Sequence, residues 1–468
     1  MRFWDRAHKY LLWLVVIAWP WQLRHTLVFA DYQGQFFEHA SISLYLTDIL
    51  ILGMVLMWGV ALMLERRKIN WGPVWVSVPA TVLVGWMWTS LIWAPEPIVA
   101  AWAAGHWSVF ALMYLYIINN VRHIAELQWP LALGVALQGG LAIAQYFANH
   151  SLGVWWLGES VLDAGQAGIP RVIIDGVAQL RAHGTLPHAN LLGGYLAIAL
   201  AMMLGAWKQV RQRWMRWVWL VAYGLGGVGL LLSLSRSAVL VWVLAVTVVL
   251  VYWLVRERSL AIRIIKTGWL ALAAMLLVIV TQWPVMVSRL DLANRLEQNS
   301  ITTRLDQVGQ FVEVFNAHKL LGVGIGQYQL ALRDVEGGGE NVGWRYNPSA
   351  GGWMQSDRVS VWRLEPVHNM FLMVVADLGV VGLVAVVWWL AGLVWQLWRT
   401  ARRQSQSGAA VMLVVGLATL TLGLSDHYLW TLQQGRLLLW LVVALATVSL
   451  SQTSYNREDG RNADQPTS

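Results

Sequence analysis

Cysteine is absent from this chain, and charged residues are scarce. Asp, Glu, Lys and Arg make up 12% of the 468 residues, about half the ~25% of a soluble globular protein. The first absence excludes a disulfide framework, cysteine-ligated metal centres and a cysteine nucleophile. The second, together with a hydrophobic content of 57%, excludes a disordered chain and an ordinary soluble enzyme.

Long apolar runs fill the chain instead. A bilayer core of about 30 Å needs about 20 apolar residues per helix, and about twelve runs reach this length. The first contains Pro20 and then Arg24, and it has no small-residue cleavage site, so we interpret it as a retained helix rather than a signal peptide. The predicted spans are 10–28, 44–64, 73–93, 100–118, 127–148, 188–207, 217–234, 237–255, 267–283, 367–397, 409–426 and 434–451.

Basic residues alternate between the loops that join these spans. Many lie at 2–9, 66–68, 122, 208–216, 256–266 and 399–403. The short loops of the opposite set carry only Arg24, Arg171, Arg181, Arg236 and Arg436. The positive-inside rule therefore predicts that both termini are cytoplasmic. Because the basic excess is an orientation signal, it gives no reason to expect nucleic acid as a partner.

The pattern predicts an all-α polytopic membrane protein with four parts. The tail is polar and is predicted to be disordered, whereas the second outer segment has nearly the charge density of a soluble domain. The parts are 1–283, with helices one to nine and an outer loop at about 149–187; 284–366, a large outer loop domain; 367–451, with helices ten to twelve; and 452–468, the cytoplasmic tail.

One stretch of the loop domain is predicted to be an amphipathic helix. Residues 300–318 place apolar side chains at helical spacing, and Gly322 follows as a stop. The apolar face consists of Leu305, Val308, Phe311, Val312 and Phe315. Beyond this helix, Asp334 and Glu336 form a carboxylate pair, which we interpret as a solvated charge pair rather than a metal motif.

Polar side chains gather at the outer ends of the spans. Arg236 lies between two apolar spans in the segment SLSRSA, where a guanidinium needs an anion or must reach the headgroups. Its planar fork suits a phosphate or diphosphate. His368 begins the tenth span, beside Asn369. It is either a hydrogen-bonded packing residue or a base. A nucleotide P-loop is excluded because no GK[ST] sequence occurs.

Four segments on the outer side, taken together in their order along the chain, resemble the O-antigen ligase/O-antigen polymerase family of bacterial membrane glycosyltransferases. The sequence departs from the family pattern at 187–190, which reads PHAN where an Asn-Pro-Asn-like run is expected, although Asn190 matches. The segments are Gly184–Ala197, Ser233–Ala238, Arg304–Tyr328 and His368–Gly382.

The resemblance implies a GT-C-like enzyme that needs no metal or other cofactor. It would transfer a glycan from an undecaprenyl-diphosphate carrier to an acceptor hydroxyl, such as that of lipid A core, at the periplasmic face of the bacterial inner membrane. Electrostatic stabilisation of the leaving diphosphate then falls to Arg236 and Arg304, and His368 is the expected base. Second-tier candidates are Arg181, Asn190 and Asn369.

Other functions remain open. Polymerisation of glycan repeats and transfer to protein use the same donor chemistry, although the single long outer loop ending directly in His368 favours a ligase. A flippase for lipid-linked sugars would need a polar path through the bilayer, whereas ionisable residues are few at mid-depth and Asp377 is the main exception. An envelope assembly or sensor protein would have no reason to place Arg236, Arg304 and His368 on the outer face.

The predicted topology can be tested by labelling introduced cysteines. In intact spheroplasts, an impermeant thiol reagent should modify Gly338→Cys and should not modify Ser405→Cys, because only the first position is predicted to face outward. The natural absence of cysteine removes the background. The opposite labelling pattern would invert the topology.

Overall fold

The computed structural model confirms an all-α membrane protein. It describes residues 3–32, 35–165, 169–174, 176–210, 212–289, 291, 295–337, 344–347, 352–355, 364–404 and 407–463. Within this part of the chain, eleven helices are long and apolar enough to cross a bilayer, and the apolar part of one further helix, Ala7–Ala18, is shorter. About twelve spans were predicted, and these helices account for them.

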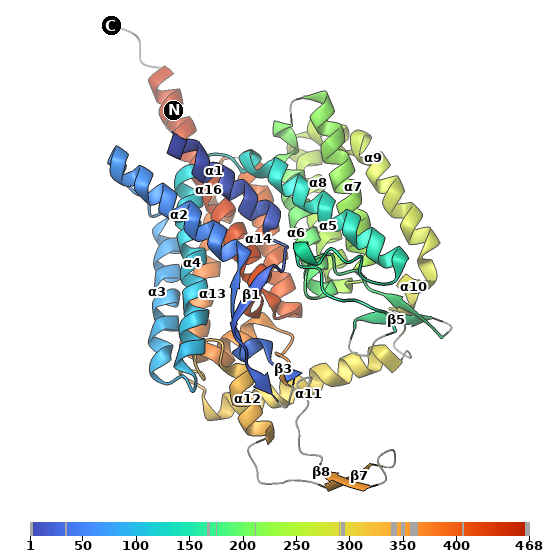
Figure 1. Cartoon of the computed structure of the whole chain (residues 1–468). Coiled ribbons are helices and arrows are strands. Elements are labelled where there is room, and N and C mark those ends of the chain that lie inside the picture. Colours follow the sequence, from blue (N-terminus) through green and yellow to red (C-terminus); the bar gives the residue numbers. More distant parts are fainter. Residues whose placement is uncertain are drawn as a thin grey trace.

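The long helices form one bundle (Figure 1). α6 and the part of α16 from Gln433 to Leu450 are almost entirely buried, whereas α9 is largely exposed on the outside of the bundle. The bounds of the long helices are α1 Phe3–Ala18, α2 Leu46–Glu65, α3 Val74–Thr89, α4 Pro97–Asn120, α5 Gln128–Ala148, α6 Ala189–Ala206, α7 Arg213–Leu232, α8 Arg236–Arg256, α9 Arg258–Thr281, α13 Met370–Gln404, α14 Ser407–Ser425 and α16 Gln433–Ala463.

Both outer segments lie at the end of the bundle opposite the two termini (Figure 1). α16 extends to Ala463, into the segment predicted to be a disordered tail, and 464–468 lie outside the described residues. The first outer segment contains the antiparallel strands β5 (Arg171–Ile174) and β6 (Val177–Leu180). The second contains α10 Trp283–Ser288, α11 Arg295–Ala317, α12 Tyr328–Gly337, β7 Trp344–Asn347 and β8 Gly352–Gln355.

The first span differs from its prediction. α1 ends at Ala18, and residues predicted to finish the span instead form β1 (Arg24–Val28), which pairs with β4 (Ile42–Tyr45). Pro20 explains the early end, because the residue before a proline is disfavoured in a helix. The short strands β2 (Asp31–Tyr32) and β3 (Gln35–Phe36) form the tip of this hairpin.

The predicted amphipathic helix of the loop domain exists, and its apolar face is only partly buried. α11 buries Gln307, Phe311 and Val314. By contrast, Leu305 is 67% exposed, and Val308 and Val312 are also exposed. These three apolar side chains therefore form a stripe that the described residues do not cover. Such a stripe is typical of an amphipathic helix that lies on a membrane surface.

The sequence GVGIG at 322–326 docks the loop domain onto a break in α13. At Gly379 the backbone has φ 68° and ψ −171°, outside the helical region. The turn after α11 pairs with this break: Val380 N–H donates to the Lys319 carbonyl at 3.0 Å, and Gly324 N–H donates to the Asp377 carbonyl at 2.8 Å. A Cβ at Gly322 would strike the Asp377 carbonyl. These glycines therefore serve close backbone packing.

Replacing Gly379 by alanine should destabilise the protein. The conformation is accessible essentially to glycine alone, and a Cβ would meet the backbone of Leu320 and Leu321. Gly379→Ala should therefore lose at least about 2 kcal/mol of stability, measured as a lower thermal midpoint in detergent.

The control is Gly416→Ala in α14, where a Cβ meets nothing within 4 Å. It should keep or raise the midpoint, because alanine favours a helix by about 1 kcal/mol over glycine. An unchanged midpoint for Gly379→Ala would contradict the docking role of this residue.

Candidate active site

A strongly basic cavity of about 510 Å³ opens at the outer ends of α6, α8 and α13, beside α11. We call it the arginine cavity. Among the described residues, its lining contains no carboxylate, while serine hydroxyls and Asn190 add neutral polar groups. The basic lining consists of Arg171, Arg181, Arg236, Arg289 and Arg304, with His188 and His368.

The turn between α7 and α8 places Arg236 at this cavity. Ser235 is the N-cap of α8 and Arg236 is its first residue, so the positive end of the helix dipole lies at the cavity. Leu234 has φ 51°, which makes the turn tight. Arg236 donates to the Arg289 carbonyl at 2.6 Å. The buried hydroxyl of Ser235 has no hydrogen-bond partner among the described residues. Such a helix start suits an anion.

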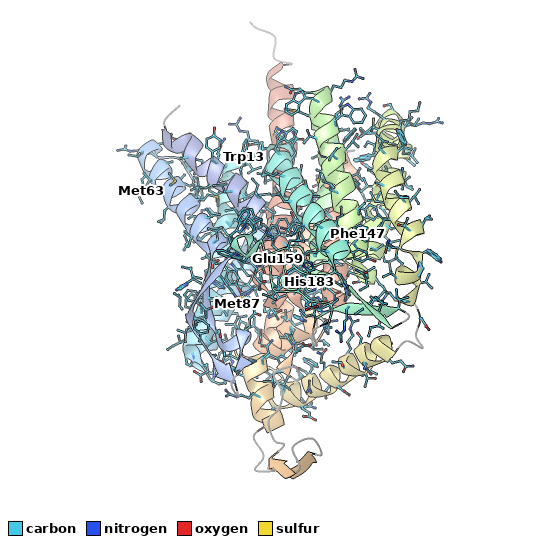
Figure 2. All side chains as sticks on the ribbon, turned by 45° about the vertical axis from the view of Figure 1, so that its right-hand side comes forward. Trp13, Met63, Met87, Phe147, Glu159 and His183 are labelled. Atoms are coloured by element: carbon cyan, nitrogen blue, oxygen red, sulfur yellow. The ribbon has the colours of Figure 1, made fainter. Side chains whose placement is uncertain are left out.

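Two buried glutamines of α5 accept hydrogen bonds from the backbone of the segment that precedes α6. Gln138 accepts from Thr185 N–H at 2.9 Å, and Gln145 accepts from Gly184 N–H at 2.8 Å. Gln145 also donates to Glu159 at 2.7 Å. Figure 2 shows Glu159 and His183 in the interior, where this segment is packed. The segment therefore presents Arg181 and His188 from a fixed backbone.

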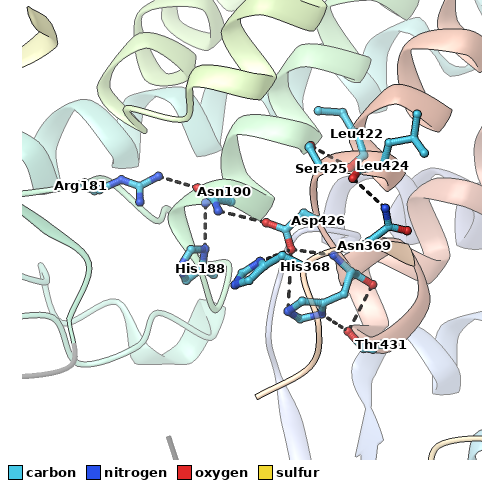
Figure 3. A network of polar contacts seen from close by, with 11 residues as sticks. Arg181, His188, Asn190, His368, Asn369, Leu422, Leu424, Ser425, Asp426 and Thr431 are labelled. Atoms are coloured by element: carbon cyan, nitrogen blue, oxygen red, sulfur yellow. Dashed lines mark hydrogen bonds and ion pairs between the residues drawn. The ribbon is translucent and has the colours of Figure 1, made fainter. Parts of the chain in front are cut away.

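A chain of polar contacts connects Arg181 to His368 (Figure 3). Arg181 donates to the Asn190 side-chain oxygen at 2.6 Å, and Asn190 donates to Asp426 Oδ2 at 3.0 Å. The other oxygen, Oδ1, lies 3.3 Å from His368 Nδ1. A proton on Nδ1 serves this contact and leaves Nε2 as an acceptor. Arg181 also donates to the Ser233 carbonyl at 3.1 Å and so braces the turn that carries Arg236.

His427 completes the group around Asp426. Its backbone N–H donates to Asp426 Oδ1 at 2.8 Å, and its ring centroid lies 5.2 Å from that of His368. Nδ1 of His427 lies 2.6 Å from the Thr431 hydroxyl. The ligand atoms of His368, Asp426 and His427 lie within 4.8 Å of one another and could hold a metal ion. The side chains of Asp334 and Glu336 lie outside the described residues.

The charges of this group favour an ionised Asp426 and neutral buried histidines. Burial opposes ionisation of Asp426, but the hydrogen bond from His368 and the charge of His427 outweigh it and hold the pKa of the carboxyl well below its usual range. Burial and then Arg181 lower the pKa of His183 to about 3. The same two causes lower the pKa of His188, whose Nδ1 accepts from Asn190 N–H at 3.1 Å.

Five of the six residues singled out from the sequence line the arginine cavity. The three first-choice residues, Arg236, Arg304 and His368, come together from α8, α11 and the start of α13. Two second-tier residues, Arg181 and Asn190, also line it. The sixth, Asn369, instead caps α13 by accepting from Phe371 N–H at 2.9 Å.

The sequence analysis missed Asp426, Arg171 and Arg289. Asp426 ends the eleventh predicted span, and an acid at a span end is a rare signal that could have identified it. Arg171 lies on β5 and Arg289 follows α10. Arg171 was counted only as an outer-loop charge and Arg289 was not singled out, because nothing in their sequence spacing relates them to Arg236.

Residues 221–387 match the family model described as O-Antigen ligase. This match supports an assignment to the O-antigen ligase/polymerase family. It includes Arg236, Arg304 and His368 and ends before Asp426. No curated protein matches the chain. The matched region and the long apolar helices together support a multi-pass membrane glycosyltransferase of the general O-antigen ligase/polymerase type.

The buried His183 should make this protein sensitive to acid. Because its pKa falls from 6.5 to about 3 on folding, the unfolded chain binds a proton that the folded chain excludes between these values. The contribution of His183 to the free energy of unfolding is complete above pH 6.5 and is about 2 kcal/mol smaller at pH 5. Neither ring nitrogen has a hydrogen-bond partner among the described residues, so His183→Leu should lose less thermal stability than the parent between pH 7 and pH 5.

The exposed His25 provides the matched control. His25→Leu should keep the parent's acid sensitivity. If His183→Leu and the parent lose equal stability on acidification, His183 is not the group responsible.

Proposed function

We propose that the protein transfers a glycan from an undecaprenyl-diphosphate carrier to an acceptor hydroxyl, with the reaction centred on the arginine cavity. The observation that carries this proposal is the meeting of Arg236, Arg304 and His368 around one cavity that has no carboxylate among its described lining residues. A diphosphate leaving group needs cationic stabilisation, and a hydroxyl nucleophile needs a base.

The diphosphate would lie between the start of α8 and α11. Guanidinium groups bind phosphate oxygens in pairs of parallel hydrogen bonds, and the α8 N-terminus adds backbone dipole. Arg304 makes no hydrogen bond or ion pair with the other described residues, so its guanidinium is available to a ligand. Each well-placed donor lowers the barrier by on the order of 3–4 kcal/mol as negative charge develops on the leaving group.

In the reaction step, the acceptor oxygen forms a bond to the anomeric carbon of the donor sugar. The bond between that carbon and the carrier diphosphate breaks, and its electron pair leaves with the diphosphate. Nε2 of His368 takes the hydroxyl proton. A single displacement of this kind inverts the anomeric configuration. The products are the new glycoside and undecaprenyl diphosphate.

Asp426 would orient His368 and stabilise its protonated form. The carboxylate lies behind the ring, on Nδ1, which directs the opposite nitrogen towards the cavity that His368 lines. The same arrangement supports the base in hydrolases that use a serine, histidine and aspartate. Arg181 and Asn190 would position Asp426 rather than contact the reacting atoms.

The acceptor that we propose is lipid A core, at the periplasmic face of the inner membrane. The assignment as a ligase rests on the single long outer loop that ends directly at His368. The basic loops support a topology in which both termini are cytoplasmic, which would place the arginine cavity on the periplasmic side, where the carrier's diphosphate lies.

The test is transfer by purified variants that are given lipid-linked glycan and lipid A core. His368→Ala should lower kcat by roughly 10²–10⁴-fold with little change in the KM for the donor, because a base acts mainly in the transition state. Asp426→Asn should lower kcat by at least about tenfold. The product should be glycosylated lipid A core rather than a longer lipid-linked glycan.

Two exposed residues of the first outer segment serve as matched controls. His150→Ala and Asp163→Asn make the same chemical changes away from the arginine cavity, and both should keep full activity. Normal turnover by a folded His368→Ala variant would remove His368 as the base. A longer lipid-linked glycan as the sole product would replace the ligase assignment by polymerase.

The proposed mechanism needs no metal ion. The arginines supply the positive charge that a metal would supply, and both Asp426 oxygens already accept hydrogen bonds from protein groups. Transfer should therefore persist in excess EDTA. Loss of activity that Mg²⁺ or Mn²⁺ restores would identify His368, Asp426 and His427 as a metal site instead.

A further inference from the structure

A second cavity of about 100 Å³ lies beneath the β1–β4 hairpin. We call it the tryptophan cavity, after Trp102, Trp107 and Trp430 in its lining. Its remaining walls come from the hairpin, the turn before α12 and the start of α16. At about 15 Å³ for one water, it has room for roughly seven waters, which is the scale of one sugar ring rather than an oligosaccharide.

Buried polar atoms line the tryptophan cavity without a hydrogen-bond partner among the described residues. They are Trp107 Nε1, Gln329 Nε2, Gln433 Oε1, Arg436 Nε and His106 Nε2, the last of which lies 3.2 Å from Asp48 Oδ2. The side chains of Trp107, Gln329 and Gln433 are at most 2% exposed. Buried polar groups are almost always hydrogen-bonded, so several orphaned groups in one cavity indicate a polar occupant. Trp107, Gln329 and Arg436 offer donors and Gln433 offers an acceptor, which suits hydroxyl groups because a hydroxyl both donates and accepts.

The lining of the tryptophan cavity includes two arginines, Arg24 and Arg436, and two acidic side chains, Glu38 and Asp377. Arg436 donates to the Thr431 carbonyl at 3.2 Å. Arg24 forms an ion pair with Glu38. Asp377 accepts from Trp430 Nε1 at 2.8 Å and from Tyr328 N–H at 3.2 Å. The cavity therefore offers hydrogen bonds and aromatic surface with little net charge. Those are the groups that contact the hydroxyls and the apolar C–H faces of a neutral sugar.

Two short connections join the cavities. Thr431 lines the tryptophan cavity, and its hydroxyl contacts His427, whose ring neighbours that of His368. Pro187 lines the tryptophan cavity and precedes His188, which lines the arginine cavity. The histidine pair therefore lies between the two cavities.

We propose that the tryptophan cavity binds an uncharged pyranose ring of the acceptor and presents its hydroxyl to His368. This inference rests on the proposed function, because it assigns the second substrate of the same reaction. The donor diphosphate and the acceptor sugar then occupy cavities of opposite character on the two sides of the histidine pair.

Saturation-transfer NMR on the full-length protein in detergent tests this assignment. The probes are the methyl glycosides of glucose, galactose, mannose and N-acetylglucosamine, together with inorganic pyrophosphate. At least one glycoside should bind, and pyrophosphate should not displace it. Trp102→Leu and Gln329→Leu should each weaken glycoside binding about tenfold, the effect of losing one good contact, while pyrophosphate binding stays unchanged.

Trp155→Leu is the matched control, because Trp155 is 75% exposed and lies outside both cavities. It should keep glycoside and pyrophosphate binding. Retained pyrophosphate binding also shows that the cavity variants are folded. In the transfer assay, Trp102→Leu and Gln329→Leu should raise the KM for the acceptor about tenfold and leave the KM for the donor unchanged.

The inference fails if no glycoside binds, if pyrophosphate displaces the bound glycoside, or if neither variant weakens its binding. The proposed function has its own contradicting result. It is wrong if pyrophosphate binds equally well to the parent and to Arg304→Gln, whether or not the glycosides bind.

Discussion

The carboxylate of Asp426 is the group on which the arrangement of the site depends. It lies between α14 and α15 (Tyr428–Thr431) and contacts Asn190 at the start of α6 and His368 at the start of α13. One buried anion thereby fixes helix ends that are far apart in sequence. Without it, buried Arg181 would lose part of its charge compensation, and His368 would lose the contact that orients its ring.

Around this anion, the fold separates two kinds of polar space. The arginine cavity concentrates positive charge at the start of α8, whereas the tryptophan cavity has charges of both signs and aromatic walls. The α13 break at Gly379 connects the loop domain to this arrangement, because it docks the chain that follows α11.

The sequence predicts the membrane fold and most of the arginine cavity, because long apolar runs and isolated outer-face arginines are strong local signals. It does not predict which face of α11 is buried, because apolar spacing cannot distinguish a face that packs on protein from one exposed beside a membrane. Pro20 ended the first helix earlier than hydropathy alone implies. Asp426 was missed because its importance lies in contacts with residues distant in sequence.

The most direct test of this account is an electron cryomicroscopy map of the protein in nanodiscs with undecaprenyl diphosphate. The account predicts density for the diphosphate between Arg236 and Arg304, with the polyprenyl chain leaving towards lipid and Nε2 of His368 facing the phosphate-bearing end. Diphosphate density in any other cavity, or a His368 ring that faces away from the arginine cavity, would contradict a shared site.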